Sequence, residues 1–409
     1  MLSRIIRHAR DPLYKNSFFI MLTSISGAGF GFAFWMLAAK LYPKEEVGVA
    51  TALISSIALL VNLSRLGLDF SIIRFFPERD KSSVFSTSAI VTTLFAVLLG
   101  VIFIAGTGLW SPELALLKSP KNLAMYLTFL AANSVATLTG VSFVAMRRAE
   151  FYFFQSLMVG SRVFFLFPFI FLGAMGIFGA YGVSFVLALT VVLFLLAKLG
   201  VELKPRINRG FLNDALHFSA GNYIAGLLMM SPNQLLPIMV LNVLGAEDAA
   251  HYYIAFAIAN LLFMIPQAVS TSLFVEGSHG EALKKSTIKS LLAIALLLTP
   301  SITSLYIFGG EVLALIGKDY AMSGFELLRI MVLAGFFVAV CHVYFSIKRV
   351  QKDVKGLVSL SSLIFVLLIG LSYVFMLEFG IVGIGYAWIA SYGFAAIVVG
   401  FVVKREGWI

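Results

Sequence analysis

The chain has 409 residues, of which 60% are hydrophobic and only 12% are charged. Soluble globular domains carry about 25% charged residues, so this composition excludes that class and indicates an integral membrane protein. The formal net charge of +10 would suggest nucleic-acid binding in a soluble chain. A multi-pass membrane protein, however, collects Lys and Arg in its cytoplasmic loops, and we expect no nucleic-acid partner.

Apolar runs bounded by charged residues or by Gly and Pro predict the membrane-spanning helices, since about 20 apolar residues cross the hydrocarbon core. Twelve runs are found, with approximate bounds 16–41, 46–70, 84–109, 122–146, 152–173, 178–199, 213–242, 249–275, 287–308, 326–347, 356–377 and 381–403. The first run is longer than the apolar core of a cleaved signal peptide, so we expect it to remain as a span. The predicted fold class is therefore an all-α integral membrane protein.

Basic residues concentrate in alternate connections between these runs. If the N-terminus and every second connection lie on one side, that side holds 22 Lys and Arg and the opposite side holds five. The positive-inside rule then predicts a multi-pass protein of the cytoplasmic membrane with both termini in the cytoplasm. Three further basic residues, Arg65, Arg162 and Arg329, fall within predicted spans.

The two halves of the chain share local patterns about 200 residues apart. The pattern at 146–148 (Met-Arg-Arg) returns at 347–349 (Ile-Lys-Arg), and that at 177–179 (Ile-Phe-Gly) returns at 381–383 (Ile-Val-Gly). We infer a duplication with an N-terminal lobe, 1–204, and a C-terminal lobe, 205–409, each of six helices. Two such pseudo-symmetric lobes around a central cleft are typical of alternating-access transporters. A compact bundle without a cavity is the alternative.

The first predicted helix of each lobe contains residues that weaken a helix at corresponding depths, namely Gly27, Gly29 and Gly31 in one and Pro232 and Pro237 in the other. Proline removes a backbone donor and glycine loosens the helix, so we predict an interruption that acts as a hinge in each. In the helix of the C-terminal lobe, backbone carbonyls left without a donor would lie beside Asn233 and Gln234. We predict that these two residues bind substrate. Close packing of helices around the glycines is the alternative interpretation.

Arg162 is the most informative single residue. If the fifth span enters the membrane near Tyr152, ten residues at about 1.5 Å each place Arg162 roughly 15 Å deep, near the bilayer centre. A charge there faces a wet cavity or a partner. The guanidinium directs two parallel donors toward an anion, which predicts a phosphate or carboxylate ligand. The alternative is a structural hydrogen bond to the carbonyls of a broken helix.

Arg65 is the second candidate for a substrate-binding arginine. Asp69 follows it four residues later, on the same face if the helix continues, and the two side chains could neutralise each other. Asn62, one turn earlier, is predicted either to line the cleft or to form an interhelical hydrogen bond.

The chain lacks a nucleotide-binding P-loop and a zinc-protease motif, and Cys341 is its one cysteine. We therefore expect no cofactor, no metal site, no disulfide and no catalytic residue, and we interpret Cys341 as a packing residue.

Two stretches resemble a known family. The run 41–50, LYPKEEVGVA, is similar to a short leucine-x-proline-x-glutamate-x-x-glycine turn after the first span, and 67–74, GLDFSIIR, is similar to a glycine-rich end of the second span. Both are features of the multidrug/oligosaccharidyl-lipid/polysaccharide (MOP) exporter superfamily, in its polysaccharide biosynthesis branch of Wzx-type oligosaccharide flippases.

This resemblance implies a flippase that moves a polyprenyl-(pyro)phosphate-linked oligosaccharide across the cytoplasmic membrane by alternating access, for the assembly of surface polysaccharide. It implies that cationic residues of the cleft, here Arg162 and Arg65, contact the pyrophosphate. The partners would be this substrate, membrane lipids, and glycosyltransferases or a polymerase of the same pathway. Two alternatives stay open: a drug/cation antiporter of the related MATE branch, and a non-transporting membrane scaffold of a glycan-assembly complex.

Overall fold

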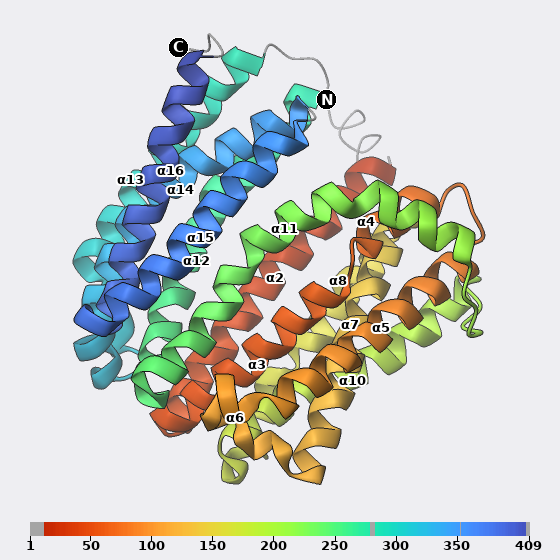
Figure 1. Ribbon diagram of the computed structural model, residues 1–409, viewed down its shortest axis with the longest axis horizontal. Helices are drawn as coiled ribbons and strands as arrows, with labels where there is room; N and C mark the ends of the chain where they lie inside the picture. The colour runs from red at the N-terminus through yellow and green to blue at the C-terminus, as the bar shows by residue number, and fades with distance from the viewer. Residues whose placement is uncertain (1–11, 279–282, 352, 406–409) are drawn as a thin grey trace, which may run out of the picture. The chain divides into compact units, whose positions relative to one another are not determined.

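The computed structural model describes residues 12–278, 283–351 and 353–405, and every element in these ranges is helical (Figure 1). The first half contains α2 (Pro12–Leu41), α3 (Lys44–Ser64), α4 (Leu68–Phe75), α5 (Lys81–Ala105), α6 (Thr107–Trp110), η1 (Pro112–Lys118), α7 (Pro120–Ala145), α8 (Ala149–Gly160), α9 (Arg162–Phe165), η2 (Ile170–Leu172) and α10 (Ala174–Lys198). The second half contains α11 (Arg209–Leu244), α12 (Ala246–Ser278), α13 (Leu283–Ala314), α14 (Lys318–Val350), α15 (Val354–Phe379) and α16 (Val382–Arg405).

Among the described residues, 11 helices are long and apolar enough to cross a membrane. The predicted spans correspond to these helices with two exceptions. The second span does not continue to residue 70, because Leu66 and Gly67 have φ angles of 50° and 76° and the chain turns there. The fifth, 152–173, is not one helix but is divided into α8, α9 and η2. Both predictions of a continuous helix were wrong.

The predicted interruptions were also wrong. Helix α2 runs without a break through Gly27, Gly29 and Gly31, and α11 runs through Pro232 and Pro237. A glycine costs a helix interior only about 1 kcal/mol. Neighbouring helices and local adjustments accommodate proline in membrane helices. A hinge function at these positions stays a prediction, since it concerns movement.

The described helices divide into two compact units. The first comprises Met1–Glu46 and Leu53–Tyr223, and the second comprises Val47–Ala52 and Ile224–Ile409. The core of the first includes Leu68, Phe85 and Phe143, and that of the second includes Cys341, Tyr344 and Ile364. The main boundary between the units along the chain falls between Tyr223 and Ile224, within α11. The lobes 1–204 and 205–409 were defined by duplication, and that division stays a prediction.

The two units share a local backbone geometry where the last membrane helix of each half begins. Gly173 precedes α10 with φ 56° and ψ −138°, and Gly380 precedes α16 with φ 56° and ψ −144°. Three residues later, a Cβ on Gly176 or Gly383 would collide with a backbone carbonyl, of Phe169 in one unit and of Phe375 in the other.

Candidate functional site

The segment that carries Arg162 is broken on both sides of it. Helix α8 ends at Gly160, and the Ser161 hydroxyl donates a hydrogen bond of 2.6 Å to the Met158 carbonyl. Helix α9 holds only four residues, from Arg162 to Phe165, and turns follow it before η2. Backbone polar groups outside a helix need partners in a membrane, so such a break requires contacts from the rest of the fold.

Two side chains from the start of the chain supply these contacts. The Tyr42 hydroxyl donates a hydrogen bond of 2.7 Å to the Leu166 carbonyl, just after α9. The Glu46 carboxylate accepts a hydrogen bond from the Ala174 N–H, at the start of α10. Burial raises the pKa of Tyr42 to about 12, which keeps its hydroxyl protonated as a donor. Tyr42 lies in the turn between α2 and α3, and Glu46 lies in the first turn of α3, so this stretch holds the segment around Arg162.

The Arg162 side chain lies between two aromatic rings. Its guanidinium carbon is 5.0 Å from the centre of the Phe34 ring in α2 and 5.7 Å from that of Tyr181 in α10. Phe34 is fully buried. The Tyr181 hydroxyl accepts a hydrogen bond from the Asn133 side-chain amide of α7. Three helices therefore hold the two rings that flank one arginine.

Gly31 completes this group. A Cβ built on Gly31 would lie 3.4 Å from Nη2 of Arg162. The glycine, which was predicted to be a hinge residue, thus gives the guanidinium room beside α2. A guanidinium whose faces contact aromatic rings gains cation–π stabilisation of up to about 2 kcal/mol when desolvated. A guanidinium carries its N–H donors in one plane, a geometry that suits phosphate and carboxylate groups.

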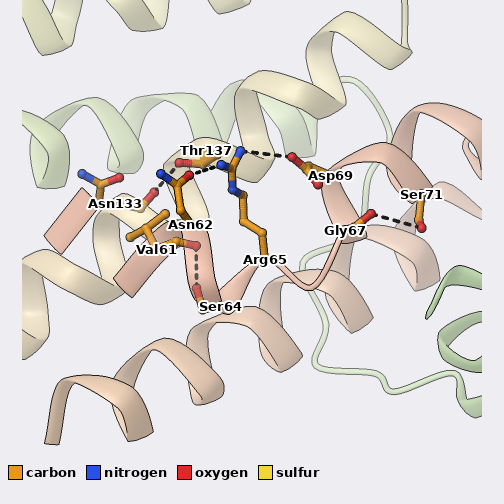
Figure 2. Close-up of polar contacts among 9 residues, drawn as sticks. All are labelled: Val61, Asn62, Ser64, Arg65, Gly67, Asp69, Ser71, Asn133 and Thr137. Atoms are coloured by element: carbon orange, nitrogen blue, oxygen red, sulfur yellow. Dashed lines mark hydrogen bonds and ion pairs between the residues drawn. The ribbon is translucent and has the colours of Figure 1, made fainter. Parts of the chain in front are cut away.

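Arg65 has a different environment (Figure 2). One Nη atom lies 3.0 Å from Oδ2 of Asp69, and the other donates to Oδ1 of Asn62. The predicted pairing with Asp69 is present, but across the left-handed turn at 66–67 rather than along one helical face. Oδ1 of Asp69 is buried and has no hydrogen-bond partner among the described residues. The charge of Arg65 is thus compensated by Asp69, which makes Arg65 less suited to bind an anion.

The second unit contains a cavity of about 300 Å³ that Asn233 lines together with Asn260, Gln267 and His342. Gln234 is not among its lining residues in the described part of the chain, and Oε1 of Gln234 is buried without a hydrogen-bond partner there. The structure therefore places Asn233 in a polar cavity and separates it from Gln234.

The polysaccharide biosynthesis protein family matches residues 37–323. The chain belongs to this family. A protein of Shigella flexneri whose name describes an O-antigen transporter is 27% identical over 156 residues, which are 37% of this chain and 37% of that protein. This alignment thus spans about a third of the relative's length.

Solved structures show that this chain has the fold of MOP-superfamily transporters. The lipid II flippase MurJ, in an inward closed conformation, matches with a TM-score of 0.74 at 14% identity, over 94% of this chain and 87% of that one. An inward-facing multidrug resistance MATE transporter matches with a TM-score of 0.70 at 15% identity, over 95% and 98%. A MOP-superfamily transporter from Pyrococcus furiosus matches with a TM-score of 0.63 at 15% identity, over 97% and 95%.

These findings confirm the resemblance carried by 41–50 and 67–74, both of which lie inside the matched region. They also confirm the all-α membrane fold. What the sequence did not reveal are the neighbours of Arg162. Phe34 and Tyr181 look like ordinary apolar residues of a span, and in a chain with 14% aromatic residues nothing distinguishes them. Asn133 gave a signal only as a polar residue within a span.

Proposed function

We propose that the protein is a flippase that moves a polyprenyl-(pyro)phosphate-linked oligosaccharide from the inner to the outer leaflet of the cytoplasmic membrane. The family match over residues 37–323 carries this proposal. The similarity of the fold to a lipid II flippase and the name of the O-antigen transporter relative support it. The process involves no covalent step, and the chain works as a transporter rather than an enzyme.

Arg162 is the residue we assign to the phosphate groups of the substrate. An arginine at the centre of a membrane helix costs about 2.5–3.5 kcal/mol, and each charge-assisted hydrogen bond contributes roughly 1.5–3 kcal/mol. One or two such bonds offset the cost while the substrate is bound. Because the two states of a transporter differ in how they contact the substrate, headgroup binding shifts the balance between them.

Other residues have secondary roles in this proposal. Arg65, with Asn62, gives a second cationic group, and Asn233 and Gln234 belong to the C-terminal lobe's share of the binding site. The lobes 1–204 and 205–409 move against each other, with the glycines of α2 and the prolines of α11 as hinges. Both termini lie in the cytoplasm, and glycosyltransferases or a polymerase of the same pathway are the expected protein partners.

A MATE-like drug/cation antiporter is the second candidate, because a MATE transporter matches with a TM-score of 0.70. Such an antiporter needs a carboxylate in its N-terminal lobe for Na⁺ or H⁺. Of the carboxylates there, Asp69 lies 3.0 Å from Arg65, and Glu46 accepts a hydrogen bond from the Ala174 N–H. A carboxylate already paired with an arginine is poorly suited to exchange cations, which favours the flippase.

Reconstitution tests these functions directly. The purified full chain is placed in vesicles that contain a fluorescent polyprenyl-pyrophosphate-linked oligosaccharide, and a lectin added outside measures how much sugar becomes exposed. The flippase predicts rapid exposure. Ethidium transport driven by an imposed Na⁺ or H⁺ gradient, without sugar exposure, would establish the antiporter instead. Failure of both transport assays with correctly folded protein would leave the scaffold of a glycan-assembly complex.

A further inference from the structure

Three helices of the second unit enclose an apolar groove. Helices α13 and α16 both pack against α14, and the three run alongside one another in Figure 1. The groove between them has a volume of about 520 Å³. Its walls come from residues 284–291 of α13, 340–347 of α14 and 396–403 of α16. All of these belong to one compact unit.

The lining residues repeat with the same spacing in all three helices. In α14 they are Val340, Val343, Tyr344 and Ile347, which is the i, i+3, i+4, i+7 pattern of one helical face, and α13 and α16 show the same pattern. Seven residues at 1.5 Å each give a groove roughly 10 Å long. One leaflet of the hydrocarbon core is about 15 Å thick. The groove therefore runs along most of one leaflet.

One end of the groove lies near the ends of the candidate membrane spans. Lys284 lines it and is the first residue of the α13 span, while α14 and α16 end their spans close to the same groove, at Val350 and Arg405. Two small residues of α16, Ala396 and Gly400, line the groove and leave it unfilled on that side. A Cβ built on Gly400, which lines the groove, would meet no atom within 4 Å.

Basic residues are concentrated at this end of the three helices. Besides Lys284, the last turn of α14 carries Lys348 and Arg349, and the last turn of α16 carries Lys404 and Arg405. Lys348 is paired with Asp353 at 3.2 Å. Basic pockets between membrane helices attract anionic lipid headgroups, and each such Lys or Arg strengthens binding severalfold.

We propose that this groove holds one acyl chain of an anionic phospholipid, with the lipid phosphate beside Lys284. An apolar groove roughly 10 Å long with a lysine at one end matches the two parts of such a lipid. The site lies within the second unit and does not depend on which molecule the protein transports. It adds a lipid-binding role to the protein, one that ties α13 and α16 to α14.

Filling the groove tests the acyl-chain part. Native mass spectrometry of the purified full chain measures retention of added dioleoylphosphatidylglycerol against dioleoylphosphatidylcholine. Gly400→Leu places a side chain in the groove and is expected to weaken retention of the anionic lipid about tenfold. Gly370→Leu in α15 is the matched control, because a Cβ there also meets nothing within 4 Å, but outside the groove. This control is expected to bind as the unchanged protein does.

A second pair of variants tests the headgroup part. Lys284→Gln is expected to lower the preference for phosphatidylglycerol about fivefold, because a lysine in direct contact with the anionic headgroup contributes about 1 kcal/mol. Lys285→Gln removes the same charge one residue away, from a side chain that does not line the groove. It is expected to leave the preference unchanged.

Three results would overturn the proposal. Gly400→Leu could retain the anionic lipid as well as Gly370→Leu does, which would mean that the lipid lies elsewhere. Lys284→Gln and Lys285→Gln could have equal effects, which would reduce the contact to a general surface charge. Polyprenyl phosphate could displace phosphatidylglycerol at a much lower concentration, which would identify the occupant as an isoprenoid chain instead.

Discussion

Phe34 in α2 lies 5.0 Å, from ring centre to guanidinium carbon, from Arg162 in α9. The guanidinium carbon lies over the Phe34 ring, which is a cation–π contact. This contact partly compensates the charge without using hydrogen-bond donors. The contact with Phe34 helps to hold the guanidinium in place, which fits the phosphate-binding role proposed for Arg162.

The first prediction concerns Arg162 itself. Arg162→Ala is expected to abolish exposure of the lipid-linked sugar in the vesicle assay, and Arg162→Lys to retain part of it. Lysine keeps the charge but not the planar pair of donors that fits a phosphate. Arg209→Ala, at an exposed arginine at the start of α11, is the control and is expected to transport normally. Normal transport by a well-expressed Arg162→Ala protein would contradict the assigned role.

The second prediction separates two roles of the glycines in α2. Gly31→Val is expected to lower transport strongly, because Nη2 of Arg162 lies 3.4 Å from the position of the added Cβ. Gly29→Val meets nothing within 4 Å of its Cβ and is expected to cause a smaller loss, through stiffening of a hinge. Transport rates of the two variants, measured at matched expression, distinguish these two roles. If Gly29→Val transports normally, the hinge proposal fails while the contact with Arg162 stands.

The sequence predicts the membrane helices well because each is a long apolar run, and it predicts the arginines because charge is rare in such runs. It did not predict the breaks. The run 152–173 is as apolar as a continuous span, but it contains Gly160 and Pro168, which weaken a helix, and the Tyr42 hydroxyl binds the Leu166 carbonyl in the broken stretch. Tyr42 and Glu46 were noticed only as parts of a family-like turn. Their function in holding the Arg162 segment emerges from the fold.

The third prediction uses the matched glycines before α10 and α16. Gly173 and Gly380 have nearly the same backbone angles, in a region that other residues rarely adopt, so alanine at either costs roughly 1–3 kcal/mol. At Gly173 the added Cβ would also lie 2.8 Å from the Glu46 carboxylate, whereas at Gly380 it meets nothing within 4 Å.

Gly173→Ala is therefore expected to lower the thermal midpoint more than Gly380→Ala and to reduce transport as well, since Glu46 helps to hold the segment around Arg162. Thermal unfolding followed in detergent gives the first comparison, and the vesicle assay gives the second. Equal shifts in the two variants would show that backbone strain alone matters and that the Glu46 contact contributes little.

The last prediction concerns Asp353, in the connection between α14 and α15. The pKa of this carboxyl is lowered chiefly by the hydrogen bond it accepts from the Gly356 N–H, at 2.9 Å, and by Lys348, at 3.2 Å. A carboxyl whose pKa is lower in the folded protein stabilises it at pH values above the unfolded pKa. That stability is lost as the pH falls through the folded value.

Thermal midpoints measured from pH 7 downward should therefore drop once the pH is below the ordinary Asp pKa of 3.8. Asp353→Asn should make this drop shallower. Glu378→Gln, at an exposed carboxylate near the other end of α15, is the control. An unchanged pH profile in Asp353→Asn would show that this cap does not contribute to the acid sensitivity of the fold.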